Sequence, residues 1–247
     1  MTPVDRGRAD RDTALVTGAA RRIGRAIALS IADCGMNVVV HYNNSPSEAL
    51  GLVAEIKKKG VFSWAMSGDL ETDRACAALI HDAAAAAGKS TLRVLVNNAS
   101  IYPETTLSDM AFPDLARCIR INAWAPLVLS RAFAAQAQGC VVNILDNRIT
   151  GRDHGHVAYL LSKQMLASIT RLCALEFAPS VRVNGVAPGL ILPPAGKTRA
   201  YLDKLKRNVP LRAHGSPRDI ASAVVFCIKS PFLTGEIITV DGGRHLL

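Results

Sequence analysis

Seven short, mostly apolar runs alternate with longer segments of helical character along this chain. The runs cover residues 14–17, 37–41, 62–66, 93–97, 140–145, 182–186 and 237–240. Strands that are apolar on both faces and separated by helices are typical of a parallel sheet covered on both sides. Right-handed crossovers then give a doubly wound α/β sheet, in which ligands bind beyond the carboxyl ends of the strands.

The chain has 247 residues and no linker or repeat that divides it, which predicts a single domain over residues 1–247. Residues 1–12 are charged and lack an apolar run, so we expect a flexible N-terminal tail. Residues 189–207 begin with GLILPPAG, which cannot form a regular helix, and continue into a charged helical stretch. We expect a substrate loop region here; a lid and a plain connection both fit the sequence.

Composition argues against several other classes of protein. The formal net charge is +9, but Lys and Arg do not cluster, so we expect an anionic cofactor or substrate rather than nucleic acid. No apolar stretch is long enough for a membrane helix and no secretory signal is recognisable, so we expect a cytoplasmic protein without a membrane partner. The six cysteines are scattered, which favours buried free thiols and no metal site.

A glycine-bearing turn follows the first predicted strand and opens a helix. Its sequence is Thr17-Gly18-Ala19-Ala20-Arg21-Arg22-Ile23-Gly24. Such a turn lets the backbone approach a pyrophosphate, which the free N–H groups of the helix N-terminus then bind. Arg22 stands where the usual pattern has its middle glycine. We expect its guanidinium to reach the diphosphate or the substrate, the alternative being a surface arginine.

The second predicted strand ends without an acidic residue. Its end reads His41-Tyr42-Asn43-Asn44-Ser45. NAD-preferring sites of this fold place Asp or Glu about 20 residues beyond the glycines, on the ribose 2′-hydroxyl. The absence of that acid leaves room for a 2′-phosphate, to which Asn44 and Ser45 can donate hydrogen bonds with help from Arg21 or Arg22. We therefore predict NADPH/NADP+ as the cofactor, and we expect His41 to be a strand-end side chain rather than a catalyst.

Two further strand ends carry small or polar residues. Asp69 and Leu70 follow the third strand, and Asp69 either accepts a hydrogen bond from an adenine amino group or caps the next helix. The fourth strand runs into Asn97-Asn98-Ala99-Ser100, where small side chains let the backbone pass close to the cofactor ribose.

Tyr159 and Lys163 form a Y-x-x-x-K pair in a helix predicted over residues 155–178. Their spacing puts both side chains on one helix face. An ammonium beside a phenol lowers the pKa of the phenol, which makes Tyr159 a usable general acid near neutral pH.

Taken together, the motifs resemble those of the short-chain dehydrogenases/reductases over nearly the whole chain. The matching segments are the turn at Gly18, Asn97-Asn98-Ala99-Ser100, Asn122, Tyr159 with Lys163, Arg182-Val183-Asn184-Gly185-Val186-Ala187-Pro188-Gly189, Thr234-Gly235 and Asp241-Gly242-Gly243. The resemblance implies a Rossmann-type domain that transfers hydride between a nicotinamide cofactor and a carbonyl or imine. It also implies that Asn122 holds a water in a proton relay, Tyr159 donates the proton, and Lys163 binds the nicotinamide ribose and tunes Tyr159.

The serine of that family's catalytic tetrad is replaced by Asp146, near the end of the fifth strand. An ionised carboxylate repels a developing oxyanion but can orient a water or a cationic nitrogen, whereas a buried carboxyl can donate a proton. A structural carboxylate that caps a loop is the alternative. Asp146, Arg22, Tyr102 just after the N-N-A-S motif, and the tail Asp241-Gly242-Gly243-Arg244-His245-Leu246 resemble the pteridine and dihydromonapterin reductases of the same superfamily.

This closer resemblance implies a pterin ring stacked between Tyr102 and the nicotinamide, with protons from Asp146 and Tyr159. The expected substrate is of dihydromonapterin, dihydrobiopterin or dihydrofolate type. Expected substrate-binding residues are Arg22, Ser100, Tyr102, Asp146 and Tyr159. Expected cofactor-binding residues are Gly18, Arg21, Arg22, Ile23, Gly24, His41, Tyr42, Asn43, Asn44, Ser45, Asp69, Leu70, Asn98, Ala99, Ser100, Lys163, Pro188, Gly189 and Leu190. The sequence departs from the pteridine reductases at Asn44, where an arginine is usual.

Two other functions fit parts of the sequence. One is a 3-oxoacyl-carrier-protein reductase or other carbonyl reductase, which the missing serine disfavours. The other is a non-catalytic NADP(H)-binding sensor, which the retained Tyr159 and Lys163 disfavour. The resemblance also implies a homotetramer formed through the helices after the fourth and fifth strands, and the helices that carry Asn122 and Tyr159 have apolar residues to spare.

Overall fold

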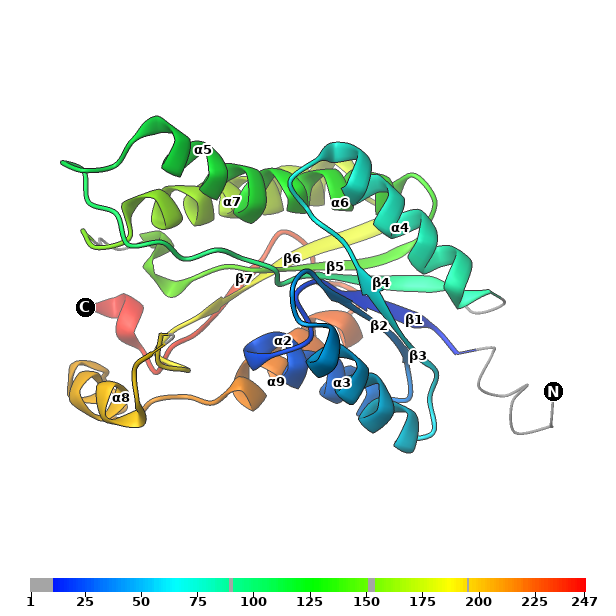
Figure 1. Ribbon diagram of the computed structural model, residues 1–247, viewed down its shortest axis with the longest axis horizontal. Helices are drawn as coiled ribbons and strands as arrows, with labels where there is room; N and C mark the ends of the chain where they lie inside the picture. Colours follow the sequence, from blue (N-terminus) through cyan, green and yellow to red (C-terminus); the bar gives the residue numbers. More distant parts are fainter. Residues whose placement is uncertain (1–10, 89–90, 151–153, 195) are drawn as a thin grey trace.

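A computed structural model of the protein describes residues 11–88, 91–150, 154–194 and 196–247. In this part of the chain a seven-stranded sheet, with all neighbouring strands parallel, has the order β3-β2-β1-β4-β5-β6-β7 (Figure 1). The strands are β1 (Thr13–Val16), β2 (Asn37–Tyr42), β3 (Ser63–Ser67), β4 (Leu92–Asn97), β5 (Gly139–Ile144), β6 (Val181–Pro188) and β7 (Ile237–Val240). The direction of winding reverses between β1 and β4, and doubly wound sheets bind their ligands beside such a reversal.

Helices cover both faces of the sheet (Figure 1). One face carries α2 (Arg22–Asp33), α3 (Pro46–Lys58) and α9 (Pro217–Lys229). The other carries α4 (Asp73–Ala87), α5 (Phe112–Ile119), α6 (Ala125–Ala134) and α7 (Val157–Glu176). A π-helical turn, Arg120–Trp124, joins α5 to α6. Shorter elements are α8 (Arg199–Leu205) and the 3₁₀ turns Asn147–Thr150, Lys206–Asn208 and Arg244–Leu246.

Alternate residues of each central strand enter two separate hydrophobic cores. Val16 and Val38 pack in the core that also contains residues of α2, α3 and α9. Leu15, Val39 and Leu95 pack in the core that also contains residues of α4, α6 and α7. All five side chains are fully buried. Because successive strand residues point to opposite faces, a sheet covered on both sides needs apolar residues at every position, which explains the uninterrupted apolar runs.

The predicted α/β Rossmann fold is confirmed, and the seven predicted strands match the observed ones closely. The helix predicted over residues 155–178 is α7, and the charged helical stretch of the 189–207 region is α8 with the following 3₁₀ turn. The predicted N-terminal tail lies outside the described residues as far as residue 10. Arg11 and Asp12, by contrast, are held to the sheet, because their carbonyl oxygens accept hydrogen bonds from the side chain and backbone of Asn37 at 3.2 Å and 2.9 Å.

The segment after β7 is attached to the loop after β5 through Asp241. The Asp241 side chain is 1% exposed. Its carboxylate accepts hydrogen bonds from Asn147 Nδ2 at 3.0 Å and from the backbone N–H groups of Gly243 at 2.9 Å and His245 at 2.7 Å. Burial opposes ionisation, but hydrogen bonds from the His245 ring, from Asn147 and from these backbone groups outweigh it and lower the pKa of Asp241.

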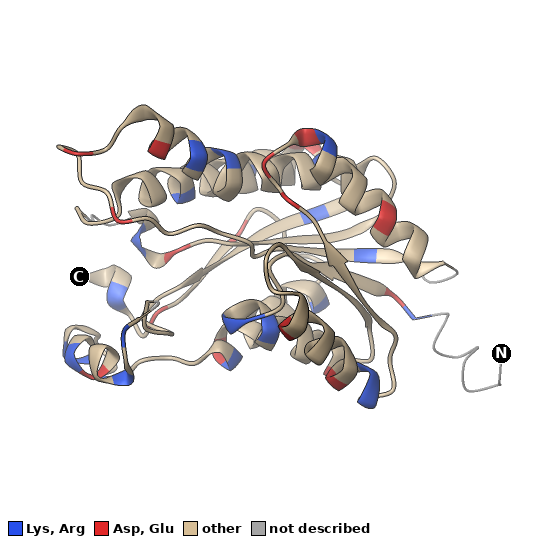
Figure 2. Cartoon of the chain, in the orientation of Figure 1, with Lys and Arg blue, Asp and Glu red and all other residues tan. Residues whose placement is uncertain are grey.

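The remaining surface features agree with the sequence in part. Lys and Arg occur on helices of both layers and around α8 rather than in one stripe (Figure 2). All six cysteines are free, but Cys34 is exposed, which corrects the expectation that all are buried. In the described residues, no helix combines the length and apolar character needed to cross a bilayer, and no cluster of His, Cys, Asp or Glu has metal-binding geometry.

Candidate active site

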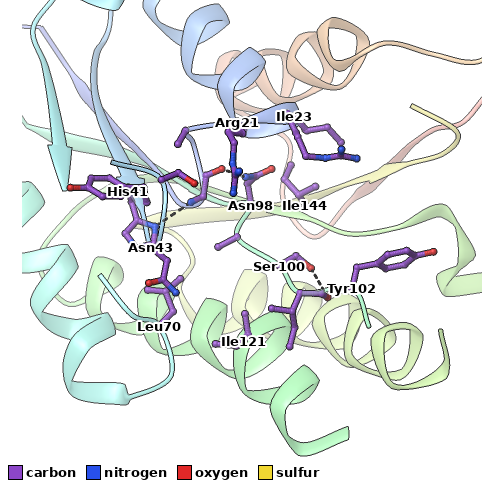
Figure 3. A pocket seen from close by; sticks show the side chains of 18 of the residues that line it. Arg21, Ile23, His41, Asn43, Leu70, Asn98, Ser100, Tyr102, Ile121 and Ile144 are labelled. Atoms are coloured by element: carbon purple, nitrogen blue, oxygen red, sulfur yellow. Dashed lines mark hydrogen bonds between the residues drawn. The ribbon is translucent and has the colours of Figure 1, made fainter. Parts of the chain in front are cut away.

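A cavity of about 620 Å³ lies beyond the carboxyl ends of the strands, and Figure 3 shows side chains that line it. Nearly all of the predicted site residues line this cavity. They are Gly18, Arg21, Arg22, Ile23, Gly24, His41, Tyr42, Asn43, Asn44, Ser45, Asp69, Leu70, Asn98, Ala99, Ser100, Tyr102, Asp146, Tyr159, Lys163, Pro188 and Gly189. Leu190 instead lines an adjoining cavity of about 560 Å³, and Asn122 lines neither.

The glycine turn is closed by contacts that leave no room for side chains. Gly18 has φ +60°, and a Cβ atom there would lie 3.0 Å from Ala99 Cα. A Cβ atom at Gly24 would overlap the carbonyl oxygen of Gly18. Asn98 stabilises the turn, because its Nδ2 donates to the carbonyl oxygens of Thr17 at 2.8 Å and Gly18 at 3.0 Å. The turn is therefore a backbone cradle of the kind that approaches a phosphate closely.

Arg22 keeps a backbone conformation typical of the glycine that it replaces. Its φ is +56°, in the left-handed region that non-glycine residues rarely adopt. Its Nη2 donates to the carbonyl oxygen of Pro193 at 2.8 Å, so the guanidinium connects the glycine turn to the loop after β6. Arg22 lines both cavities. Because Arg22 is also exposed, its contact with a diphosphate or substrate remains a prediction beside the surface-arginine alternative.

His41 is buried and organises the turn. Its Nδ1 accepts the N–H of Gly18 at 3.1 Å, its Nε2 lies 3.2 Å from the carbonyl oxygen of Gly68, and its own carbonyl accepts the N–H of Ala19 at 2.9 Å. These partners assign the proton to Nε2. Burial lowers the pKa of His41 to about 4, against a smaller opposing effect of the Gly68 carbonyl, so the ring is neutral near pH 7. Both ring nitrogens are used within the protein, which agrees with a strand-end role rather than a catalytic one.

Asp69 does not cap the helix that follows it. Its Oδ1 accepts the N–H of Glu71 at 3.0 Å in a local turn. The helix α4 begins at Asp73, and its N-cap is Thr72, whose hydroxyl accepts the N–H of Ala75 at 3.1 Å. The capping alternative for Asp69 is therefore wrong, because the chain makes one more turn before the helix starts. Asp69 lines the cavity, where an adenine contact remains a prediction.

Asn122 is buried in the π-helical turn, and its amide is fully occupied. Oδ1 accepts hydrogen bonds from Ser100 Oγ at 3.0 Å and the N–H of Ile101 at 2.9 Å. Nδ2 donates to the carbonyl oxygen of Ile101 and to Ser162 Oγ, both at 3.0 Å. An amide offers two donors and one acceptor oxygen with two lone pairs, so none is left for a water. A water-holding role, which remains a prediction, would need the main chain of Asn122.

Tyr159, Lys163 and Asp146 lie together at the floor of the cavity. Tyr159 Oη donates to Asp146 Oδ2 at 3.0 Å. Lys163 Nζ donates to the carbonyl oxygen of Ile144 at 2.7 Å and lies 5.7 Å from the centre of the Tyr159 ring. Tyr159 is 8% exposed and Lys163 is 2% exposed. The structure thus brings together three of the four predicted catalytic side chains.

The pKa of Tyr159 runs against the sequence-based expectation. Burial and the charge of Asp146 raise it well above its ordinary value, whereas Arg148 opposes this only in part. Burial lowers the pKa of Lys163 to about 8, against an opposing effect of Asp146. The expectation of a lowered pKa for Tyr159 is therefore wrong: burial and Asp146 raise this pKa, and the Lys163 ammonium donates to the carbonyl oxygen of Ile144. The phenol is neutral and carries its proton near pH 7.

Arg148 is the main residue that the sequence analysis missed. It belongs to the 3₁₀ turn Asn147–Thr150 and forms a two-pronged ion pair with Asp146, through Nε to Oδ1 and Nη2 to Oδ2, both at 2.9 Å. Both of its terminal nitrogens lie 3.2 Å from Tyr102 Oη. Burial alone lowers the pKa of Arg148, but the hydrogen bonds and charge of Asp146 outweigh it and raise the pKa above its ordinary value. An arginine two residues after a carboxylate gives no sequence signal of this pairing.

Tyr102 stands where the two cavities meet, and it is 39% exposed. Its ring stacks on His156 with a centroid distance of 3.8 Å and an interplanar angle of 18°. It meets the ring of Tyr159 edge-on, with a centroid distance of 4.6 Å and an angle of 89°. Figure 3 shows Tyr102 near Ser100 at the end of the cavity away from His41. A flat ligand ring can stack on Tyr102 only on a face that His156 does not cover.

Sequence comparisons place the chain among reductases. The profile of the family described as enoyl-(acyl carrier protein) reductase matches residues 18–245. An uncharacterized oxidoreductase from Mycobacterium tuberculosis is 36% identical over 97% of this chain and 94% of its own length. A 3-oxoacyl-[acyl-carrier-protein] reductase from Staphylococcus epidermidis is 33% identical over 95% of this chain and 99% of its own length.

Two solved structures are similar to this chain over nearly its whole length. The crystal structure of FolM alternative dihydrofolate reductase 1 from Brucella canis, complexed with NADP, has a TM-score of 0.90 and 30% identity, and covers 97% of this chain and 96% of its own. The corresponding Brucella suis structure, also with NADP, has the same TM-score and identity and covers 97% of both chains. The fold, the Tyr159–Lys163 pair at the cavity floor and these similarities lead to one assignment: the chain belongs to the short-chain dehydrogenase/reductase family of oxidoreductases.

Proposed function

We propose that this protein is an NADPH-dependent reductase that reduces a carbon–nitrogen double bond of a pterin ring. The observation that carries the proposal is the Asp146–Tyr159 hydrogen bond of 3.0 Å at the position where ketone reductases of the family have a serine. A carboxylate is a poor partner for a ketone oxyanion but a good acceptor for the N–H groups of a heterocycle. The structural similarity to dihydrofolate reductases supports the same choice.

The residues around the larger cavity fit a dinucleotide. A Cβ atom at Gly18 or Gly24 would press on Ala99 or on the carbonyl oxygen of Gly18, so glycine at both positions permits the tight turn, whose backbone N–H groups would bind a pyrophosphate. The chain from Asn43 to Ser45 has no acidic side chain to repel a 2′-phosphate. Bound NADPH would supply the hydride. Lys163 would contact the nicotinamide ribose, with Asn98, Ala99 and Pro188 beside the cofactor.

Proton delivery falls to Tyr159. As hydride adds to the ring carbon, the adjacent ring nitrogen takes the proton of Tyr159 Oη, and Tyr159 becomes a phenolate that solvent later reprotonates. Asp146 accepts a hydrogen bond from the Tyr159 hydroxyl, and it would also orient an N–H group of the ring. A proton donor of this kind contributes about 10²- to 10⁴-fold to the rate.

Substrate binding uses the junction of the two cavities. Arg22, Tyr102, Asp146 and Tyr159 line both of them, so a ring held there has its side chain in the smaller cavity. Stacking on Tyr102 would hold the ring, because flat aromatic systems prefer such contacts. Arg22 would bind the ring edge or a cofactor phosphate, and Ser100 would line the ring site. Leu190 lines the smaller cavity and would therefore contact the substrate rather than the cofactor.

A 3-oxoacyl-carrier-protein reductase is the second candidate, favoured by the 33% identity to such enzymes. Both candidates are tested by mixing the protein with NADPH and dihydrobiopterin, dihydromonapterin or dihydrofolate, with an acetoacetyl thioester in parallel, and following the nicotinamide absorbance. Fast oxidation with a pterin and little with the thioester supports the proposal. Oxidation only with the thioester refutes the pterin assignment.

Replacing Asp146 by serine separates the two candidates in a second way. In a pterin reductase, Asp146→Ser should lower kcat with the pterin by about 10²-fold, because serine keeps one acceptor oxygen but loses the charge and the second oxygen of the carboxylate. In a ketone reductase the same change should leave thioester turnover unchanged or raise it. A variant that keeps full pterin turnover would contradict the role given to Asp146.

The homotetramer also remains a proposal. Exposed apolar side chains on one helix support it, namely Leu161, Met165, Leu172 and Leu175 of α7. Phe112 at the start of α5 is 79% exposed as well. Contiguous exposed apolar surface commonly marks an interface. Light scattering that gives a stable monomer would refute the tetramer.

A further inference from the structure

Arg148 holds Asp146 with the geometry of a strong ion pair. Besides the two side-chain bonds of 2.9 Å, the backbone N–H of Arg148 donates to Asp146 Oδ1 at 2.9 Å. The side chains of Arg148 and Asp146 are only 21% and 13% exposed. A two-pronged guanidinium–carboxylate pair with little solvent contact fixes the position of both oxygens as well as their charge.

The same carboxylate oxygen is shared with the proton donor. Asp146 Oδ2 accepts from Arg148 Nη2 at 2.9 Å and from Tyr159 Oη at 3.0 Å. The guanidinium carbon of Arg148 lies 5.7 Å from the centre of the Tyr159 ring and 5.5 Å from the centre of the Tyr102 ring. Arg148 therefore acts on Tyr159 in two ways, through Asp146 and directly across the face of the ring.

Loss of the Tyr159 proton would place two negatively charged groups beside each other. Within the described residues, the titratable and charged groups that act on this pair are Arg148 from the 3₁₀ turn, Lys163 from α7 and Tyr102 from the loop before α5. Lys163 Nζ is directed at the carbonyl oxygen of Ile144. Among the described residues, Arg148 is the cation in contact with Asp146. Like charges this close make proton release difficult unless a cation is placed next to them.

We propose that Arg148 is a positioning residue for proton delivery: it fixes the Asp146 carboxylate as the acceptor of the Tyr159 hydroxyl, and its charge offsets the phenolate that forms when Tyr159 gives its proton to the substrate. The inference rests on the proposed function only in taking Tyr159 as the proton donor, which holds for a pterin or a ketone. It assigns to Arg148 an effect on the chemical step rather than on cofactor binding.

The test compares Arg148→Met, which keeps most of the apolar stem, with Arg148→Lys, which keeps the charge but not the two-pronged geometry. For Arg148→Met we expect kcat to fall roughly 10- to 100-fold, within the range that a general acid contributes. The KM for NADPH should stay within about twofold, because Arg148 is not among the residues that line the larger cavity. The solvent isotope effect on kcat should rise as proton transfer limits the rate, and Arg148→Lys should restore part of the loss.

The matched control is Arg93→Met. Arg93 also forms an ion pair, with Asp12 at 3.7 Å, and donates to the carbonyl oxygen of Gln138 at 3.1 Å, but it lies in β4 near the amino ends of the strands. This variant should keep the wild-type kcat and isotope effect. Arg148→Met should also lose much less activity in an Asp146→Asn background than in the wild type, because the pair that it breaks is already altered.

Several results would overturn the inference. One is an unchanged isotope effect with a raised KM for NADPH and a lowered Tm, which is what a purely structural brace would give. Another is an equal loss of activity in the wild-type and Asp146→Asn backgrounds. If the wild type reduces the thioester and no pterin, the proposed substrate fails and the same variants test Arg148 with the thioester. If it reduces neither, both proposals fall.

Discussion

The left-handed backbone at Arg22 gives a prediction about stability that can be separated from its side chain. Arg22 has φ +56° at the start of α2. A non-glycine residue in this region costs roughly 1–3 kcal/mol of strain, and glycine costs almost none. Replacing Arg22 by alanine removes the guanidinium but keeps the strain, whereas replacing it by glycine removes both. The two variants therefore differ only in the backbone contribution.

The magnitude follows from two opposing contributions. Relief of strain favours Arg22→Gly over Arg22→Ala by roughly 2 kcal/mol, the middle of the range for a left-handed residue. The greater freedom of glycine in the unfolded chain takes back about 0.4–1 kcal/mol. We expect Arg22→Gly to be about 1 kcal/mol more stable than Arg22→Ala, which corresponds to a rise of about 2–4 °C in Tm for a chain of this size.

Thermal unfolding followed by circular dichroism, without ligand and at one protein concentration, measures this difference. The control is Ala78→Gly at an exposed position within α4, where glycine should lower the free energy of unfolding by about 1 kcal/mol. Opposite signs at positions 22 and 78 are the expected result. If glycine is destabilising relative to alanine at both, the left-handed conformation of Arg22 is not the one present in solution.

Three further predictions concern the site and its supports. Tyr159→Phe should lower kcat by at least about 10²-fold while leaving NADPH affinity, measured by fluorescence titration, unchanged, because only the proton donor is lost; a variant that retains turnover would contradict the role of Tyr159. Because the pKa of Lys163 is lowered to about 8, kcat/KM should fall as the pH rises through that value and the ammonium loses its charge. In Lys163→Arg this fall in kcat/KM should occur at a higher pH. If it occurs at the same pH, a group other than Lys163 causes it. The pKa of Asp241 is below its ordinary value, so its stabilising contribution is present above the unfolded-state pKa and is lost as the pH falls through the folded-state pKa. Asp241→Asn should therefore lower Tm at pH 7 and make Tm less sensitive to acid, and equal acid sensitivity of the two proteins would count against this.

Local patterns predicted most of the fold and the outline of the site. Uninterrupted apolar runs predicted the strands because both faces of this sheet are covered. The positions of Gly18, Tyr159 and Lys163 were predictable because each motif depends on spacing along one turn or one helix. The replacement of serine by Asp146 was visible because the surrounding motifs fix its position near the end of β5.

Contacts between distant segments were not predictable in the same way. The imidazole of His41 accepts a hydrogen bond from Gly18, on a neighbouring strand end, and no spacing rule connects them. The ion pair of Arg148 depends on the 3₁₀ turn after β5, which folds the chain back on itself. The pKa of Tyr159 was predicted with the wrong sign because burial and Asp146 outweigh the opposing charge of Arg148, and burial is a property of the whole fold.

The π-helical turn at Arg120–Trp124 has a consequence for how the chain tolerates insertions and deletions. A turn of this kind amounts to one extra residue in an α-helix. Since each residue of an α-helix rotates the chain by roughly 100°, the extra residue changes the direction in which all the following side chains point. Here α5 packs on α7, whereas α6, in the same unbroken run, packs on α4. Deleting a single residue from this turn would rotate the face of α6 that packs on α4 away from it. The number of residues between α5 and α6 is therefore more constrained than the identity of each side chain.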